Sequence, residues 1–401
     1  MLNLKGEKLP LIRQPSIAIL AAFIALFLTS NTLRAQAEAE PRPAPSARVL
    51  DAATWKEVDA SVERALKWLA EGQNKDGSFE TYRSGQPGVT SLCLMAFMAQ
   101  GHNVGDGEYG DVLQRAVDYI SAQQQANGII ARLGTPGPMI SRHVPIAAGV
   151  AIVYNHALSA LALAEVYGQG NDKQTKDLKP IIERAIAATR TMQGWQEQTR
   201  QRGGWRYLTR TESSHSDLSV TGWQLMFLRS ARTGGFDVPA ESIDEAVQYV
   251  ESCFDKKHGT FSYLAGSDQH FTRGMAGAGI LALAHAGKHD SPMATRTGDW
   301  ILRNNFDIYN GLGRFHSRQD HGDRYHYGLL TCSQAMYQLG GRHWREFYPS
   351  TVQSILANQL RDGSWPAESV LSDSKFGTRY TTALCVLSLG APNQLLPIFQ
   401  R

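Results

Sequence analysis

Apolar residues recur along this chain in two alternating textures, which predict two kinds of helix. The first texture is striped: within residues 57–69, Val58, Val62, Leu66 and Leu69 fall on one face, and charged residues fill the others. The second is apolar almost all round, as in VTSLCLMAFMA at 89–99. A striped helix faces water on one side, whereas a helix that is apolar on every side is buried. The apolar texture returns five more times, at 157–167, 220–228, 274–284, 328–337 and 381–389. No run alternates with the period of a strand, so the pattern predicts an all-α fold.

A short phrase repeats between the two kinds of helix. GQNKDGSFE at 72–80 and NQLRDGSWP at 358–366 both carry a glutamine, then Asp-Gly-Ser, then an aromatic residue. Weaker copies lie between them, and the marker glycines are Gly77, Gly128, Gly204, Gly259, Gly313 and Gly363. Successive markers are 50 to 55 residues apart, except for one interval of 76. Self-similarity at a fixed period indicates a repeat architecture. We therefore expect residues 55–401 to form a single (α/α)6 toroid of six helix-pair repeats, the buried helices inside and the striped ones outside.

The repeated phrase resembles a known sequence repeat. Its clean copies, Gln73-Gly77-Phe79 and Gln359-Gly363-Trp365, are similar to the QW repeat of squalene cyclases and of protein prenyltransferase β subunits. The resemblance spans nearly the whole chain after its N-terminal segment, and it implies a terpenoid cyclase-like toroid around an apolar cavity. We expect the glycine to permit a tight reversal and the aromatic ring to pack on the glutamine amide.

The N-terminus has the pattern of a secretory signal peptide. Basic residues precede the apolar run 17–28, and Ala35-Gln36-Ala37 follows it. The run is short for the ~20 residues of a spanning helix, which favours a cleaved leader over a membrane anchor. We expect residues 1–37 to be removed on export to the periplasm or beyond, and the Pro-rich stretch 38–54 to be a linker.

Charge and cysteine content narrow the classes of partner. The predicted cleavage would take the formal charge of +3 to about zero and leave no basic block, so nucleic acid is not an expected partner. Cys93, Cys332 and Cys385 lie in apolar runs, where a free cysteine behaves as a small buried hydrophobe. The expected partners are an apolar or isoprenoid-like small molecule and, peripherally, a membrane. No cofactor is expected.

Polar and aromatic residues stand near the starts of the predicted inner helices. Inner helices of a toroid begin on one rim, so these side chains should converge on a cavity mouth and make a ligand site. The predicted ligand-binding residues are Tyr154, His156, His270, Arg273, Tyr325, His326, Arg379 and Tyr380.

Asp217 is the candidate catalytic acid. Squalene cyclases protonate an alkene with the middle aspartate of an Asp-x-Asp-Asp-Thr motif, and the stretch 217–221 reads Asp-Leu-Ser-Val-Thr. Ser219 thus stands at the position of the proton donor, and a hydroxyl is too weak an acid for that task. Helix capping is the other interpretation of Asp217, and asparagine should then replace it almost without effect.

The metal motif of the prenyltransferases is also incomplete. Those subunits hold zinc with an Asp-x-Cys and a later histidine, and the matching positions here are Asp323-x-Tyr325 and Tyr380. One ligand remains where a catalytic zinc needs three, so no metal site is predicted and Asp323 is expected at the rim. A loop at 315–328, rich in His and Asp, is expected to line the mouth, with metal binding as the alternative. A Gly/Pro-rich segment at 131–153 is expected to be a packed connecting loop, with an entrance flap as the alternative.

Three functions remain open from the sequence. The first is binding of an isoprenoid-like or other apolar ligand without the family's chemistry. The second is a cyclase-like enzyme that uses Asp217 or another acid. The third is a carbohydrate-active toroid, for which Tyr154, His156 and Arg273 are suitable residue types, although a glycosidase needs two facing carboxylates.

Overall fold

The computed structural model describes residues 49–134, 137–142, 144–170, 172–195, 201–209, 215–311, 323–369 and 371–400. Within them, six outer helices alternate along the chain with six inner ones. The outer helices are α2 (Ala52–Glu71), α4 (Gly110–Ala122), α6 (Asp172–Gln193), α8 (Ala240–Ser252), α10 (Pro292–Arg303) and α12 (Gly341–Leu356). The inner helices are α3 (Gly88–Met98), α5 (Ile146–Val166), α7 (Leu218–Thr233), α9 (Arg273–His285), α11 (Tyr325–Leu339) and α14 (Gly377–Leu389). The predicted α/α toroid is confirmed.

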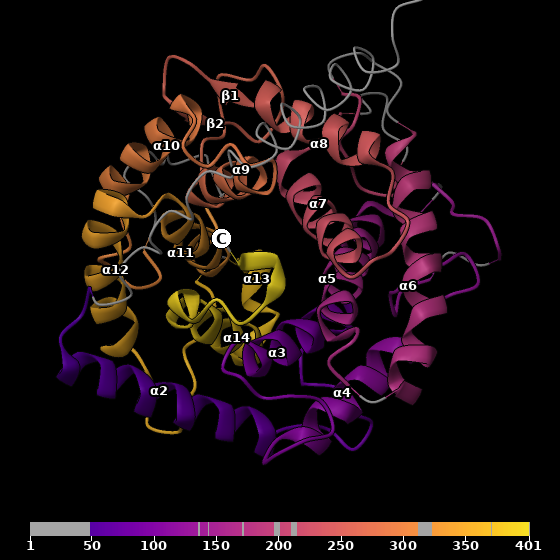
Figure 1. Ribbon diagram of the computed structural model, residues 1–401, viewed down its shortest axis with the longest axis horizontal. Helices are drawn as coiled ribbons and strands as arrows, with labels where there is room; N and C mark the ends of the chain where they lie inside the picture. The colour runs from indigo at the N-terminus through magenta and orange to yellow at the C-terminus, as the bar shows by residue number, and fades with distance from the viewer. Residues whose placement is uncertain are drawn as a thin grey trace, which may run out of the picture. The chain divides into compact units, whose positions relative to one another are not determined.

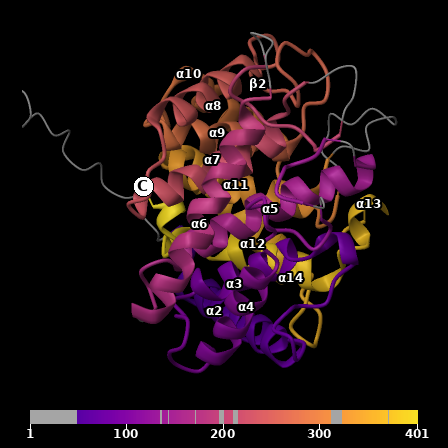
Figure 2. The same cartoon turned by 90° about the vertical axis from the view of Figure 1, so that its right-hand side faces the viewer.

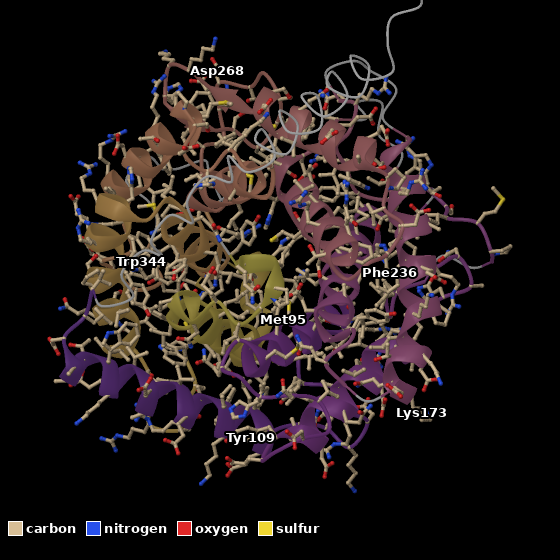
Figure 3. All side chains as sticks on the ribbon, in the orientation of Figure 1. Met95, Tyr109, Lys173, Phe236, Asp268 and Trp344 are labelled. Carbon is tan, nitrogen blue, oxygen red and sulfur yellow. The ribbon has the colours of Figure 1, made fainter. Side chains whose placement is uncertain are left out.

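The inner helices form a closed ring. Each packs against the next in chain order, and α14 packs against α3 to complete the circle, while α12 meets α2 in the outer ring. Figure 1 shows the two rings, one inside the other. Every residue of α3 is buried, whereas α2 buries one stripe that includes Val58, Val62, Leu66 and Leu69. In Figure 3, Lys173 lies at the outer edge and Met95 of α3 lies well inside. The two textures of the sequence therefore correspond to the two rings.

In four of the repeats, a glutamine at the end of an outer helix bonds to the next outer helix. In the first copy, Gln73 Nε2 donates to the carbonyl of Gly77 at 3.0 Å and to that of Val112, in α4, at 2.8 Å. Gln359 does the same at the end of the chain, bonding to Gly363 and to Ser61 in α2. Both amide hydrogens of each of these glutamines are thus bonded to carbonyl groups.

The turn glycines lie where a side chain does not fit. Gly77, Gly128, Gly259 and Gly363 all have positive φ, a conformation that L-residues avoid. In the third copy the residue with positive φ is Gly203, so the predicted marker Gly204 is one position too late. The remaining marker, Gly313, lies outside the described residues.

Short elements complete the fold. Strands β1 (Phe254–Asp255) and β2 (Thr260–Phe261) form a two-stranded antiparallel ribbon in the described part of the chain. It forms the reversal after α8 and is too short to leave an alternating pattern in the sequence. Three 3-10 turns lie at Arg83–Gly85, Ala391–Asn393 and Pro397–Phe399, and α13 covers Leu371–Ser374. The four cysteines are buried free thiols.

The C-terminal segment covers one end of the inner ring. Ile398 donates its backbone N–H to Glu165 Oε2 near the end of α5, and Gln338 Nε2, near the end of α11, donates to the carbonyl of Phe399. Figure 2 shows the C-terminus and α13 at opposite ends of this unit. The cavity described below lies at the end of the ring where the inner helices begin.

Two predictions about the N-terminal part fall wholly or partly outside the described residues. The leader, 1–37, lies outside them, as does 38–48 of the predicted linker. The linker's last residues are helical, because α2 begins at Ala52 with Asp51 as its cap. Among the described helices, only α5 is long and apolar enough to cross a membrane, and 67% of its most apolar window is buried, as in the core helix of a folded domain.

Candidate functional site

A cavity of about 570 Å³ lies at the end of the toroid where the inner helices begin. All six inner helices contribute to its wall, from Gly88 of α3 round to Leu384 of α14. Its aliphatic lining includes Val89, Leu92, Val150, Leu158, Met275 and Leu384. Its aromatic lining includes Tyr154, Tyr207, Trp223, Tyr263, Tyr327 and Tyr380. Such a volume and lining are typical of a small-molecule site.

One wall of the cavity carries a hydrogen-bonded network. Ser219 Oγ donates to Asp217 Oδ1 at 2.7 Å, and the Tyr154 hydroxyl contacts Ser219 Oγ at 2.6 Å. On the other side of Asp217, one guanidinium nitrogen of Arg206 donates to Oδ2 at 2.8 Å and to the hydroxyl of Tyr263 at 2.7 Å.

A contact between two phenols and a cation–π contact extend this network. The Tyr263 hydroxyl contacts that of Tyr207 at 2.6 Å, and the Arg206 guanidinium lies 4.4 Å from the centre of the Tyr207 ring. Burial raises the pKa of Tyr154 well above its usual value and also raises that of Tyr207. The phenols of this wall are therefore neutral at physiological pH.

Asp217 serves as a helix cap and an ion-pair partner. It precedes α7 and accepts from the backbone N–H of Val220 at 2.8 Å, while its other oxygen pairs with Arg206. The side chain is fully buried. Both oxygens accept hydrogen bonds, and Oδ2 accepts its bond from a guanidinium, which is the geometry of an ionised carboxylate. Ser219, which lines the cavity, separates Asp217 from a ligand.

Part of the cavity lining is charged. Lining residues from the segment around α13, Asp373 and Lys375, lie there with Arg324 and His270. Arg324 Nε is 3.4 Å from Asp373 Oδ2, and the Lys375 ammonium lies 5.3 Å from the centre of the Phe376 ring. These charged side chains are thus paired with one another or stacked on a ring.

Three of the eight predicted ligand-binding residues line the cavity, namely Tyr154, His270 and Tyr380. His156 does not, because it turns outward from α5 toward α6. Its Nδ1 accepts from the backbone N–H of Ile130, and its Nε2 is 2.9 Å from Thr189 Oγ1. Burial lowers the pKa of His156 to about 3, so it is a neutral histidine that joins a turn to an outer helix.

Arg273 is also turned away from the cavity. Its guanidinium is buried against Asp323, with Nε 2.9 Å from Oδ2, and also donates to the carbonyl of Asn305. Asp323 is 1% exposed, so the expectation of a rim carboxylate is wrong. The pair links the starts of α9 and α11 inside the wall. The same charge pairing explains why neither group faces a ligand.

Tyr325, His326 and Arg379 contact other parts of the wall. His326 Nδ1 is 2.7 Å from Glu368 Oε2 and its Nε2 is 2.8 Å from the Tyr309 hydroxyl. Tyr325 packs edge-on against His326, with ring centres 5.1 Å apart. Arg379 stacks on a tryptophan of α2, with its guanidinium 3.5 Å from the ring centre. None of the three lines the cavity.

The sequence did not single out Arg206, Tyr207 and Tyr263. The two tyrosines occupy one position in successive repeats, two residues after the turn aromatic in GGWRYL and GTFSYL. Aligning the weak copies of the repeat would have marked that position. The role of Arg206 depends on its pairing with Asp217, which no spacing indicates.

Metal ligands do not gather in the described part of the chain, where no group of three or more His, Cys, Asp or Glu side chains is placed to hold an ion. Of the predicted His/Asp loop, residues 315–322 lie outside the described residues, and the rest begins with Asp323. The segment 131–153 divides: its last part, from Ile146, is the first two turns of α5, where Ala147 and Val150 line the cavity.

Comparison with known proteins supports the fold. No protein-family model and no curated protein sequence matches this chain. Among solved structures, the type II terpene cyclase MstE from Scytonema matches with a TM-score of 0.52 at 13% identity, over 85% of this chain and 100% of that one. A variant of MstE in complex with geranylgeranyl dihydroxybenzoate, its substrate, matches with a TM-score of 0.51 at 13% identity, over 86% and 99%.

A second group of solved structures is similar to the same extent. A glycosidase variant matches with a TM-score of 0.55 at 12% identity, over 87% of this chain and 100% of that one. Another variant, in complex with glucose, gives 0.54 at 13% identity, over the same shares. At these identities the likeness concerns the fold, which is the α/α toroid used by both classes of enzyme.

Proposed function

We propose that this chain binds an isoprenoid-like or other apolar small molecule in the cavity at the N-terminal ends of its inner helices. The observation that carries the proposal is the lining: aliphatic and aromatic side chains from all six inner helices surround about 570 Å³. Burial of apolar ligand surface against such walls supplies roughly 25 cal/mol per Å². The similarity to a terpene cyclase fold agrees with this proposal but does not identify the ligand.

Binding without cyclisation is favoured by the state of Asp217. Protonation of an alkene requires a carboxylic acid with its proton directed at the substrate. Asp217 instead accepts hydrogen bonds on both oxygens, pairs with Arg206, and lies behind Ser219. A carbohydrate-active function is less well supported, because Asp373 is the only carboxylate among the described residues that line the cavity, and glycoside hydrolysis uses two.

The test is a titration of the chain with farnesol, followed by tryptophan fluorescence, to which Trp223 in the cavity wall contributes. We expect saturable binding that Val150→Trp weakens, because an indole at this half-buried position would occupy part of the cavity. Ile146→Trp is the matched control. It lies one turn earlier on α5, is 59% exposed and does not line the cavity, so it should bind as the parent does.

Two results would contradict the proposal. One is the absence of farnesol binding by a folded parent together with saturable binding of an oligosaccharide, which would support the carbohydrate alternative. The other is binding with the parent's affinity by both tryptophan variants, which would place the ligand elsewhere.

We also propose that the protein is exported before it binds its ligand. The proposal rests on the first 37 residues, in which basic residues, an apolar run and an A-x-A sequence follow one another. Expressed with its own N-terminus in a bacterium, the protein should be recovered outside the cytoplasm with a chain that begins near Glu38. Recovery of an intact N-terminus in the membrane fraction would support an anchor instead.

A further inference from the structure

The polar network on the cavity wall satisfies its own hydrogen bonds. Arg206 donates to the hydroxyl of Tyr263, which contacts that of Tyr207 at 2.6 Å. Tyr207 is also hydrogen-bonded to Tyr154, and a serine hydroxyl continues the path to Asp217. Each hydroxyl along this path accepts one hydrogen bond and donates the next, so no hydrogen is left for a ligand. Polar recognition of a ligand must therefore come from other side chains of the lining.

Three other side chains of the lining keep a hydrogen-bond donor free. They are Trp223 of α7, Tyr327 of α11 and Tyr380 of α14. Within the described part of the chain, none of the three side chains makes a hydrogen bond, and the N–H or O–H of each remains accessible. An indole N–H can only donate, and a phenol has one hydrogen to donate. This part of the lining therefore offers a ligand three donors.

The three donors lie on neighbouring parts of the wall. The rings of Trp223 and Tyr327 have centres 6.0 Å apart and are tilted by 40°. Helices α11 and α14, which carry the two tyrosines, pack against each other, and Tyr327 is close enough to Tyr380 to interact with it electrostatically. Burial, together with nearby carboxylates, raises the pKa of both phenols. Both are therefore neutral at physiological pH and keep their hydrogens.

Resting on the proposed apolar-ligand site, we propose that this part of the wall binds the carbonyl oxygen of an apolar ketone. A carbonyl oxygen has two lone pairs and brings no hydrogen, so it can accept from two donors at once. Trp223 and Tyr327 are adjacent, and Tyr380 supplies a third donor in the same cavity. A ligand without such an oxygen would remove these donors from water and give them no new partner, which costs free energy.

Other polar groups fit these donors less well. An alcohol adds a hydrogen of its own, and the oxygens beside it are phenolic, which accept weakly because their lone pair is conjugated with the ring. A carboxylate would bring its charge close to Asp217 and Glu368, which already disfavour ionisation of the two phenols. Of the cations in the described lining, Arg324 is ion-paired and Lys375 is exposed to solvent. A neutral acceptor is therefore the group that matches this wall.

The first experiment compares three ligands that share one carbon skeleton. They are geranylacetone, the secondary alcohol made by reducing its carbonyl group, and the hydrocarbon that lacks the oxygen. Dissociation constants are measured with the parent chain by isothermal titration calorimetry. A net hydrogen bond changes affinity roughly fivefold. We expect the ketone to bind roughly fivefold tighter than the hydrocarbon, or more, and the alcohol to lie between the two.

Infrared spectroscopy reports on the carbonyl group directly. Hydrogen bonds to a carbonyl oxygen lower its stretching frequency. Geranylacetone with an isotope-labelled carbonyl should therefore absorb at a lower frequency in the complex than in hexane. A bound ketone that absorbs as it does in hexane would overturn the inference, whatever the variants show.

A pair of variants locates the donor. Tyr327→Phe removes one hydroxyl and keeps the ring, so it should weaken the ketone roughly fivefold, move its stretching frequency toward the hexane value and leave the hydrocarbon unchanged. Tyr167→Phe is the matched control, because Tyr167 is also half-buried but does not line the cavity. It should leave all three affinities and the frequency unchanged. Equal melting temperatures establish that the variants are folded.

The outcomes separate this inference from the proposed function. Equal binding of the ketone and the hydrocarbon by the parent would overturn the carbonyl inference and leave the apolar-ligand site standing. An alcohol that binds as tightly as the ketone would also overturn it, as would a preference for the ketone that Tyr327→Phe leaves intact. Binding of none of the three would remove the proposed function itself.

Discussion

Alanine at Gly363 should destabilise the toroid at the joint where its outer ring closes. Gly363 has a φ of +95°, and a Cβ there would lie 2.5 Å from the carbonyl oxygen and 2.8 Å from the carbonyl carbon of Arg64, in α2. An L-residue at positive φ costs about 1–2 kcal/mol. The close approach adds to this, because the atoms in the way are backbone atoms of a helix and cannot rotate aside.

The size of the second effect follows from the hydrogen bonds at the joint. Relief of the overlap moves the turn away from α2, and Gln359 holds α2 through its bonds with the carbonyl and the hydroxyl of Ser61, both 2.8 Å long. Weakening two such bonds removes about 1–3 kcal/mol. Together with the backbone strain, Gly363→Ala should lower the free energy of unfolding by about 2–5 kcal/mol.

Gly235→Ala is the matched control. Gly235 has a φ of +85°, yet no atom lies within 4 Å of a Cβ built there. It should therefore lose the strain alone, about 1–2 kcal/mol. Urea unfolding followed by circular dichroism gives both values. Equal losses in the two variants would refute the reasoning, because the approach of the turn to α2 would then contribute nothing.

Three further predictions concern buried charge. Asp217→Asn keeps the cap but removes the ion pair with Arg206, so it should lower the free energy of unfolding by about 2 kcal/mol. A cap alone would make this variant nearly silent. No loss in urea unfolding would mean that the ion pair contributes nothing to stability. Burial raises the pKa of Glu165 from 4.5 to about 7, so about 3 kcal/mol of stability that is present below pH 4.5 should be lost as the pH rises through 7. Glu165→Gln should make the melting temperature nearly independent of pH across this window. A pH dependence that the variant leaves unchanged would contradict the assignment to Glu165. Arg273→Met leaves the buried carboxylate of Asp323 unpaired and should lower the free energy of unfolding by about 3–5 kcal/mol. Arg342→Met, at an exposed ion pair, should lower it by less than about 1 kcal/mol. Similar losses in the two variants would show that burial of the Arg273 pair does not matter.

The fold could be predicted because its two rings impose different patterns on the sequence. An inner helix touches neighbours on every side, so nearly all its positions are apolar, and an outer helix shows one stripe. The turns could be located because a tight reversal beside a helix admits only glycine. The register of one weak copy was off by a residue, since Gly203 and Gly204 are adjacent and only the structure shows which has positive φ.

The site could be predicted less completely, because the start of a helix does not say which way a side chain points. Tyr154 and His156 are two residues apart on α5, which places them about 200° apart around the helix. One therefore faces the cavity while the other faces α6. The partner of Arg273 comes from another repeat, 50 residues away. Such pairings are set by the tertiary structure, and no local pattern in one sequence records them.

Ring closure by Gln359 has a consequence for how this protein loses its structure. In an open stack of repeats the terminal units have one neighbour each, so unfolding frays inward from the ends. Here Gln73 joins α2 to α4, and Gln359 joins α12 to α2 by the same pair of bonds. Among the described helices, no outer one is then a terminal unit from which fraying could start. The ring should melt as one cooperative unit, and deleting a single helix pair should unfold all of it rather than shorten it.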